Sequence, residues 1–291
     1  MRYKTLFFLL TFVWTALSVT GKQRDFVLQS GIPVPIACNS SEEQVVHTAL
    51  ELLRRDLQTV LSATAKVETN TGTILIGTAG RSELIDQSGV DTSVLKGKKQ
   101  AFLLTVSPEG KLIVAGSDGH GTAYGILEIS RLLGVSPWEW WADVTPEKKK
   151  LFKLSSKFRS VQSPSVEYRG IFINDEDWGL MPWSNKTYEP SDVNGEIGPR
   201  TNERIFELLL RLRANTYWPA MHECTLPFFL TKGNREVAKK YGIFMGASHC
   251  EPMACSAAGE WRRRGNGAYD YVNNSAAVYK FWEDRVKEVA D

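Results

Sequence analysis

Apolar positions recur at helical spacing between residues 45 and 61. The segment Ser40-Ser41-Glu42-Glu43 comes directly before this repeat and has the spacing of a capping box, in which a serine and a glutamate cap the first turn of a helix. The pattern predicts a long amphipathic helix that ends near Ser62. A second helix is predicted from Gly119 to Leu133.

Short continuous apolar runs accompany these helices and predict strands at 73–77, 101–106 and 111–115. The last two runs are joined by Ser107-Pro108-Glu109-Gly110, which is typical of a hairpin turn. Helices and strands together predict a small α/β sandwich domain over residues 22–145. The polar and basic segment 146–166 that follows predicts a linker or an edge strand.

From Tyr168 the pattern changes to a repeat of strand, loop and helix. The predicted elements are strand 168–173, helix 203–213, strand 214–218, helix 234–241, strand 242–247 and helix 276–290. This alternation predicts parallel βαβ units, and we interpret residues 167–291 as the first three units of an incomplete (β/α)8 TIM barrel. Because such a barrel takes about 250 residues, we expect an N-terminal fragment of a larger enzyme or a truncated gene product.

Polar side chains follow each of the three predicted parallel strands. They are Asn174-Asp175-Glu176-Asp177, then Met221-His222-Glu223-Cys224, and then His249-Cys250-Glu251. A (β/α)8 barrel has its site at this end of the strands. Adjacent carboxylates repel one another, so we expect ligand binding or catalysis to compensate for their crowding.

The N-terminus predicts export. Arg2 and Lys4 precede a short apolar run, and small or polar residues follow up to Gly21, which is the order of a signal peptide over residues 1–21. We expect a secreted or periplasmic protein without stable membrane insertion, since no other segment is apolar enough to cross a bilayer. A net charge of +2 and the short basic runs 148–150 and 262–264 do not indicate nucleic-acid binding.

The four cysteines, Cys38, Cys224, Cys250 and Cys255, allow three disulfide pairings that sequence cannot distinguish. A metal site could combine the last three with His222 and His249. There is no C-x-x-C and no H-E-x-x-H, so we predict no metal and no cofactor.

Two further motifs have structural explanations. The spacing G-x-G-x-x-x-G at 119–125 differs from the dinucleotide motif and favours a tight turn with close helix packing. The cluster Trp138, Trp140 and Trp141 could stack on sugars, but we favour a seal between two domains.

Three long stretches, YRGIFINDEDWGL (168–180), LLRLRANTYWPAMHE (209–223) and YGIFMGASHCEPM (241–253), together with SPWEWWADVTP (136–146), resemble glycoside hydrolase family 115, the xylan α-1,2-glucuronidases. The resemblance runs from about residue 25 to 291. It implies an inverting hydrolase that removes α-1,2-linked glucuronic acid or its 4-O-methyl ether from glucuronoxylan. A homodimer of the full-length enzyme is compatible with the resemblance.

The resemblance also implies roles for individual residues. Asp175 is the catalytic candidate, Asn174 lines the glucuronate pocket beside it, Trp218 forms a pocket wall, and His249 and Glu251 lie on a loop that faces the pocket. His222 and Glu223 are candidates for substrate binding, with strand-end packing as the alternative.

An inverting glycosidase needs a second carboxyl group, which we expect beyond residue 291 together with most of the cationic groups that hold the substrate's carboxylate. Other readings stay open. The chain could be another exported carbohydrase, such as an α-glucuronidase of another family or a β-hexosaminidase, or a non-catalytic carbohydrate-binding remnant.

Overall fold

The computed structural model describes residues 23–174, 177–249 and 251–290. Its first half, the N-terminal unit (residues 23–162), is built on a six-stranded mixed sheet. In sheet order the strands are β3 (Ala65–Glu68), β2 (Val34–Cys38), β4 (Ile74–Thr78), β6 (Leu112–Gly116), β5 (Phe102–Val106) and β8 (Arg159–Gln162). The first four run parallel, and β5 is antiparallel to both of its neighbours.

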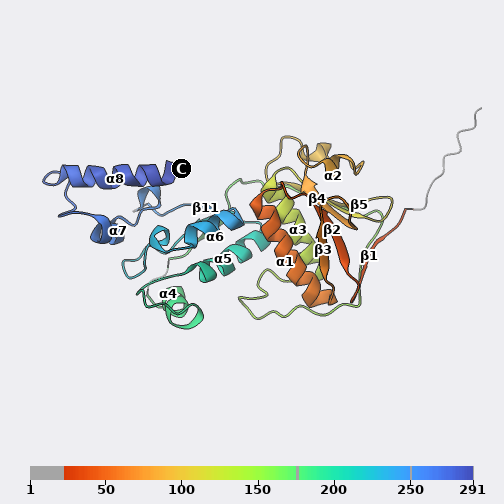
Figure 1. The fold of residues 1–291 in the computed structure, drawn as a ribbon, viewed down its shortest axis with the longest axis horizontal. Coiled ribbons are helices and arrows are strands. Elements are labelled where there is room, and N and C mark those ends of the chain that lie inside the picture. The colour runs from red at the N-terminus through yellow and green to blue at the C-terminus, as the bar shows by residue number, and fades with distance from the viewer. Residues whose placement is uncertain (1–22, 175–176, 250, 291) are drawn as a thin grey trace, which may run out of the picture.

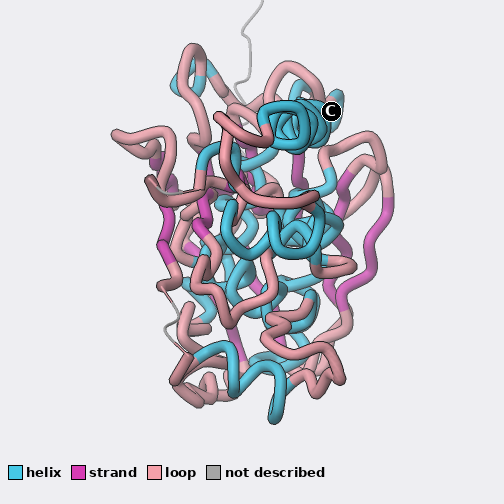
Figure 2. Tube along the Cα trace, turned by 90° about the vertical axis from the view of Figure 1, so that its left-hand side faces the viewer, coloured by secondary structure: helices cyan, strands magenta, loops and turns pink. Residues whose placement is uncertain are grey.

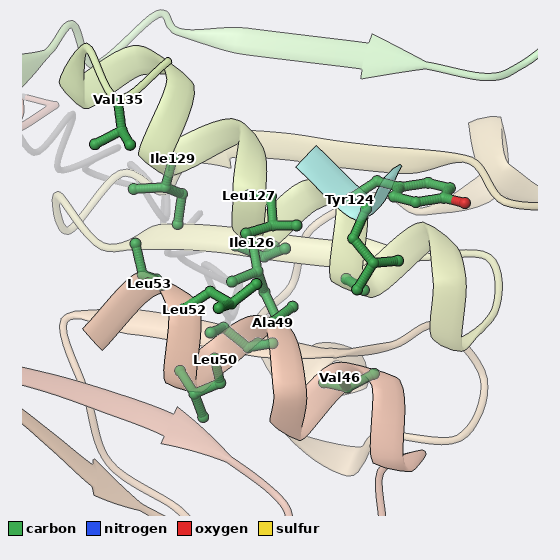
Figure 3. Packing of buried hydrophobic residues seen from close by; sticks show 14 of the residues in the cluster. Val46, Ala49, Leu50, Leu52, Leu53, Tyr124, Ile126, Leu127, Ile129 and Val135 are labelled. Carbon is green, nitrogen blue, oxygen red and sulfur yellow. The ribbon is translucent and has the colours of Figure 1, made fainter. Parts of the chain in front are cut away.

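Two long helices, α1 (Gln44–Leu61) and α3 (Gly119–Leu133), pack against one face of this sheet (Figure 1). Their apolar side chains point toward one another, for example Ala49 and Leu53 of α1 and Ile126 of α3 (Figure 3). The predicted capping box is wrong, because α1 begins after Glu43 without a side-chain cap. The glutamate of the predicted box, Glu43, pairs with Arg81. Its neighbour Glu42 accepts hydrogen bonds from the amide and the hydroxyl of Thr78 at 2.9 and 2.7 Å.

The opposite face of the sheet is also covered. Helix α2 (Glu83–Asp86) and the short 3₁₀ helix η1 (Ser93–Leu95) pack there through Ile85 and Leu95. Side chains alternate along β4: Ile74 and Ile76 join the cluster under α1 and α3, and Leu75 joins the cluster on the other face. Both faces of the sheet are therefore buried, as its parallel strands require.

The glycine motif at the start of α3 serves packing, as predicted. Asp118 caps the helix by accepting a hydrogen bond from the Gly121 amide at 2.8 Å. A Cβ atom on Gly121 would lie 2.1 Å from the carbonyl oxygen of Ala101, so the helix reaches β5 only because this residue has no side chain.

Residues 151–162 form strands that extend the N-terminal unit. Strand β7 (Leu151–Leu154) pairs antiparallel with β1 (Phe26–Gln29), and β8 pairs with β5 at the sheet edge. Of the two alternatives for segment 146–166, the structure has the edge strand.

The C-terminal unit (residues 167–290) contains a three-stranded parallel sheet in the order β11-β10-β9. Its strands are β9 (Gly170–Phe172), β10 (Thr216–Trp218) and β11 (Phe244–Met245), and the helices between them are α5 (Pro199–Arg211) and α6 (Asn234–Tyr241). The predicted alternation is confirmed, although the strands are shorter than predicted. The fold is mixed α/β, and an eight-stranded barrel stays a prediction.

Several short elements lie in segments where the sequence predicted only loops. They are α4 (Leu180–Trp183), the π-helix η2 (Ser184–Tyr188), the 3₁₀ helices η3 (Phe228–Leu230) and η4 (Pro252–Ala254), and α7 (Ala257–Arg264). Helix α8 (Ser275–Ala290) ends the described chain and packs with α7 through Trp261 and Phe281. Both lie at the end of the molecule away from the N-terminal unit, which Figure 2 shows facing the viewer.

The two units share one buried interface. Arg211 of α5 is almost fully buried and forms ion pairs with Asp56 of α1 and with Glu207. Trp140 and Trp141 pack against Trp183, and the Trp141 indole donates to the carbonyl oxygen of Arg204 at 3.1 Å. The tryptophan cluster therefore seals the junction, as predicted, although Trp138 stays 48% exposed.

Candidate active site at the ends of the parallel strands

The carboxyl ends of β9, β10 and β11 lie side by side at one edge of the sheet. The hydrogen-bond ladder continues just past the strands, from the Ile173 amide to the Trp218 carbonyl at 2.9 Å and from the Gly246 amide to the Tyr217 carbonyl at 3.0 Å. The three polar loops therefore start level with one another. This is the edge at which open parallel sheets bind ligands.

Trp218 ends β10 on the face of the sheet that α5 and α6 do not cover. Tyr217 points the other way and is buried against Phe206 of α5. The Trp218 indole lies over Gly246, where a Cβ atom would be 2.1 Å from the indole nitrogen, and its ring centroid is 5.9 Å from that of Phe172. It remains 40% exposed. An aromatic ring that is fixed on one side and open on the other suits stacking on a sugar.

Asp177, His222 and Cys224 meet where the loops after β9 and β10 approach each other. The His222 ring nitrogen Nδ1 lies 3.1 Å from Asp177 Oδ1, and the Cys224 thiol donates to the same oxygen. The hydrogen bonds from Cys224 and His222 lower the pKa of Asp177. Partial burial, together with the bond to Asp177, raises the pKa of Cys224.

The loop after β11 borders a separate cavity of about 820 Å³ between α6 and α8. His249 lines this cavity and is exposed, whereas Glu251 is 7% exposed. Burial raises the pKa of Glu251 to about 7, with a smaller contribution from the nearby Glu260 carboxylate. A buried carboxyl group beside a cavity that stays protonated near neutral pH can act as a general acid.

The same cavity contains cationic side chains that sequence reasoning missed. Arg235 and Lys239 stand one turn apart on α6 and line its wall. Arg235 lies over the Phe229 ring at 5.2 Å and 3.9 Å from Glu288. The sequence does place these two cations four residues apart on a helix just before the third strand. The same spacing is equally common on helix faces that only contact solvent, so it did not identify a site.

The predicted site residues are only partly brought together. Asp175 lies outside the described residues, and Asn174 is exposed directly after β9. Glu223 forms a surface ion pair with Arg262 of α7. His249 and Glu251 line the cavity, whereas Trp218 and His222 are not among its lining residues.

The cysteines that the structure describes, Cys38, Cys224 and Cys255, carry free thiols. Cys38 is buried in the N-terminal unit, and Cys255 is buried with Trp261 between α7 and α8. Cys250 lies outside the described residues. Within the part of the chain that the structure covers, no helix has the length and apolar character needed to cross a membrane.

Comparisons with known proteins identify the class. Residues 161–291 match the model of glycosyl hydrolase family 115. The resemblance that the motifs carry is therefore confirmed over residues 161–291.

A solved structure of a 4-O-methyl-α-glucuronidase of family GH115, BtGH115A, described as specific for decorated arabinogalactans, is 83% identical to this chain with a TM-score of 0.88. The match covers 91% of this chain and 35% of BtGH115A, so the chain spans about a third of that protein's length.

More distant structures share the fold at most. CpGH84D is 12% identical with a TM-score of 0.50, and the match covers 78% of this chain and 35% of that one. The GH20 exo-β-N-acetylglucosaminidase from Vibrio harveyi is 13% identical with a TM-score of 0.46, covering 85% and 37%. The search of curated proteins returned no match.

Proposed function

We propose that this chain supplies part of the active site of a glycoside hydrolase that releases α-linked glucuronic acid or its 4-O-methyl ether from a decorated polysaccharide. The observation that carries the proposal is the 83% identity to BtGH115A over 91% of this chain. The motifs suggested glucuronoxylan as the polymer, whereas the relative acts on decorated arabinogalactans. We favour the arabinogalactan because of the high identity.

The described residues fit the chemistry of an inverting hydrolase. Such an enzyme needs a protonated carboxyl group that donates to the leaving oxygen and a carboxylate that activates water, roughly 6.5 to 9.5 Å apart. Glu251 has the raised pKa of an acid, and Asp175 stays the candidate for the second group. Arg235 and Lys239 are cations suited to a uronic acid carboxylate.

We place these residues in a (β/α)8 barrel of which β9, β10 and β11 are the first three strands. The sheet leaves its two outer strands with one unpaired edge each. We therefore expect no turnover from the 291-residue chain alone. Export to the periplasm or the medium is a further part of the proposal. It predicts that the N-terminus of the exported protein, read by mass spectrometry, begins after about residue 21.

A chimera tests the proposal without the isolated chain having to be active. The segment of BtGH115A that this chain matches is replaced by residues 23–291, and release of 4-O-methylglucuronic acid is measured on arabinogalactan and on glucuronoxylan. We expect release from arabinogalactan at a rate within about tenfold of the parent, with a single product anomer of inverted configuration in NMR spectra.

The outcomes separate the alternatives. Faster release from glucuronoxylan would replace the proposed polymer by xylan. Activity on an aryl N-acetyl-β-hexosaminide would favour a hexosaminidase. A chimera that folds, retains arabinogalactan and releases no sugar would show a binding role only. The Glu251→Gln chimera is the matched control for chemistry, since the amide keeps the shape of the side chain but cannot donate the proton of an acid.

A further inference from the structure

Three side chains with different metal-ligand atoms lie together at the carboxyl edge of the parallel sheet. Among the residues that the structure describes, Asp177, His222 and Cys224 have ligand atoms that all lie within 4.8 Å of one another. His222 Nδ1 is 3.1 Å from Asp177 Oδ1 and 3.8 Å from Cys224 Sγ. The first two residues are exposed and the third is half-buried, so an ion can reach the group from solvent.

We infer that this group, the Asp-His-Cys cluster, binds a divalent transition-metal ion of the zinc type. Thiolate, imidazole and carboxylate are the three ligand types that Zn²⁺ uses, with bonds of about 2.0 to 2.3 Å. Tetrahedral angles then place ligand atoms about 3.5 Å apart, and the distances of 3.1 and 3.8 Å lie on either side of that value. Cys224 Sγ and Asp177 Oδ1 are in direct contact, so a small rotation of the carboxylate admits the ion.

The ligand types also decide which ion fits. Mg²⁺ and Ca²⁺ are hard cations that take oxygen ligands, and the Asp-His-Cys cluster offers one carboxylate beside a sulfur and a nitrogen. Binding involves no redox step. The Cys224 thiol loses its proton to solvent, and the sulfur lone pair forms the bond to the metal.

The backbone holds the three ligands in place before an ion arrives. Residues 222–225 form a turn that is closed by a hydrogen bond from the Thr225 amide to the His222 carbonyl at 2.9 Å. The carbonyl of Cys224 packs on Gly195, where a Cβ atom would lie 2.0 Å from its oxygen, and Gly195 has a φ of +79°, a conformation that favours glycine. Asp177 itself has a left-handed φ of 73°. Because the ligand residues are already held in place, binding an ion costs little conformational entropy.

Three protein ligands leave one tetrahedral position free. Structural zinc sites fill all four positions with side chains, whereas sites that bind water or a substrate keep one open. The Asp-His-Cys cluster is of the second type, and an oxygen ligand such as water or a carboxylate fits its open position. Metal binding is measured without a sugar. The inference can therefore be tested independently of the hydrolase proposal.

Metal titration of the untagged 291-residue chain tests the inference. After dialysis against a chelator, zinc uptake is measured by calorimetry and elemental analysis, and Co²⁺ serves as the spectroscopic probe. We expect one ion per chain and a sulfur-to-cobalt charge-transfer band. Cys224→Ser should abolish that band. His222→Ala and Asp177→Asn should each weaken binding by about tenfold or more, because each removes one of three metal bonds.

Two variants outside the cluster serve as controls. His249→Ala removes an exposed imidazole from the next loop, and Cys255→Ser changes a buried thiol between α7 and α8. Both should keep the stoichiometry, the affinity and the cobalt band, and thermal melts check that every variant is folded. No stoichiometric uptake, or uptake that survives Cys224→Ser with an unchanged spectrum, would overturn the inference. Either result leaves the chimera experiment unaffected, so the two proposals fail separately.

Discussion

The two sheets of this molecule differ in how their faces are covered. The six-stranded sheet of the N-terminal unit is buried on one face by α1 and α3 and on the other by α2 and η1. The three-stranded sheet of the C-terminal unit is covered by α5 and α6 on one face only. Its other face exposes aromatic side chains, with exposed fractions of 41% for Phe172, 40% for Trp218 and 46% for Phe244.

Because of this difference, apolar residues of the same type have different roles in the two sheets. The apolar residues of β4, β5 and β6 in the N-terminal unit are buried and hold the fold together. On the open face of the C-terminal sheet, Phe172 and Trp218 lie beside the polar loops, where they can contact a ligand or another part of an enzyme, whereas Phe244 begins β11 and stacks on His120 of α3. An exposed apolar patch of this kind is typical of a binding surface. The same residue type should therefore respond very differently to truncation in the two sheets.

Phe102→Ala and Phe172→Ala test this most directly. Phe102 is 1% exposed in β5 and lies 5.3 Å below the Arg213 guanidinium. Its truncation leaves a cavity, so we expect the free energy of unfolding to fall by about 4 kcal/mol. Phe172→Ala should cost less than about 1 kcal/mol, since its ring is already partly in water. Urea unfolding followed by circular dichroism measures both. Equal losses would mean that the open face is part of the stabilising core.

The substitution Glu251→Gln tests the buried carboxyl group on the loop after β11. The folded pKa of Glu251, about 7, lies above its unfolded value of 4.5. The folded state therefore binds more protons between these values, so the stability that this group contributes is full below pH 4.5 and is lost as pH rises through 7. Gln lacks this titration. We expect equal stabilities of both proteins at pH 4, and at pH 8 a variant more stable by on the order of 3 kcal/mol.

Unfolding at a series of pH values, with Glu223→Gln as the control, checks this expectation. Glu223 lies on the surface in an ion pair with Arg262, so its substitution should shift stability little at any pH. A difference between wild type and Glu251→Gln that does not change between pH 4 and pH 8 would contradict both the raised pKa and the role of Glu251 as an acid.

Much of the fold could be predicted because the local pattern and the long-range packing agree. Helix α3 and the strands β4, β5 and β6 lie within one residue of their predicted bounds. Strands β1, β2 and β3 were not predicted, because they are short and their pairing partners lie far away along the chain, as with β1 and β7. The capping box failed because α1 begins later than the box requires, with Glu43 itself at the N-cap position and its carboxylate paired with Arg81, a residue 38 positions away.

The site was harder to predict than the fold. Sequence position was enough to place the polar segments at the ends of three parallel strands, since strand order follows from the βαβ repeat. It could not show that Asp177 meets His222 and Cys224, because Asp177 lies 45 residues before His222. The metal set considered from sequence joined Cys224 to Cys255 instead, and Cys255 is buried in a different cluster.

The smallest effect is expected for Trp218→Ala. This variant tests whether the open face of the C-terminal sheet binds sugar. Trp138 is the matched control, a tryptophan of similar exposure, 48% against 40%, that belongs to the N-terminal unit. Stacking contributes about 1 kcal/mol, so Trp218→Ala should weaken retention on arabinogalactan in affinity electrophoresis by about fivefold, while Trp138→Ala leaves it unchanged. Equal losses for the two variants would show nonspecific contact with exposed aromatic rings. Unequal losses would locate binding at the open face, because the two side chains differ chiefly in which unit presents them.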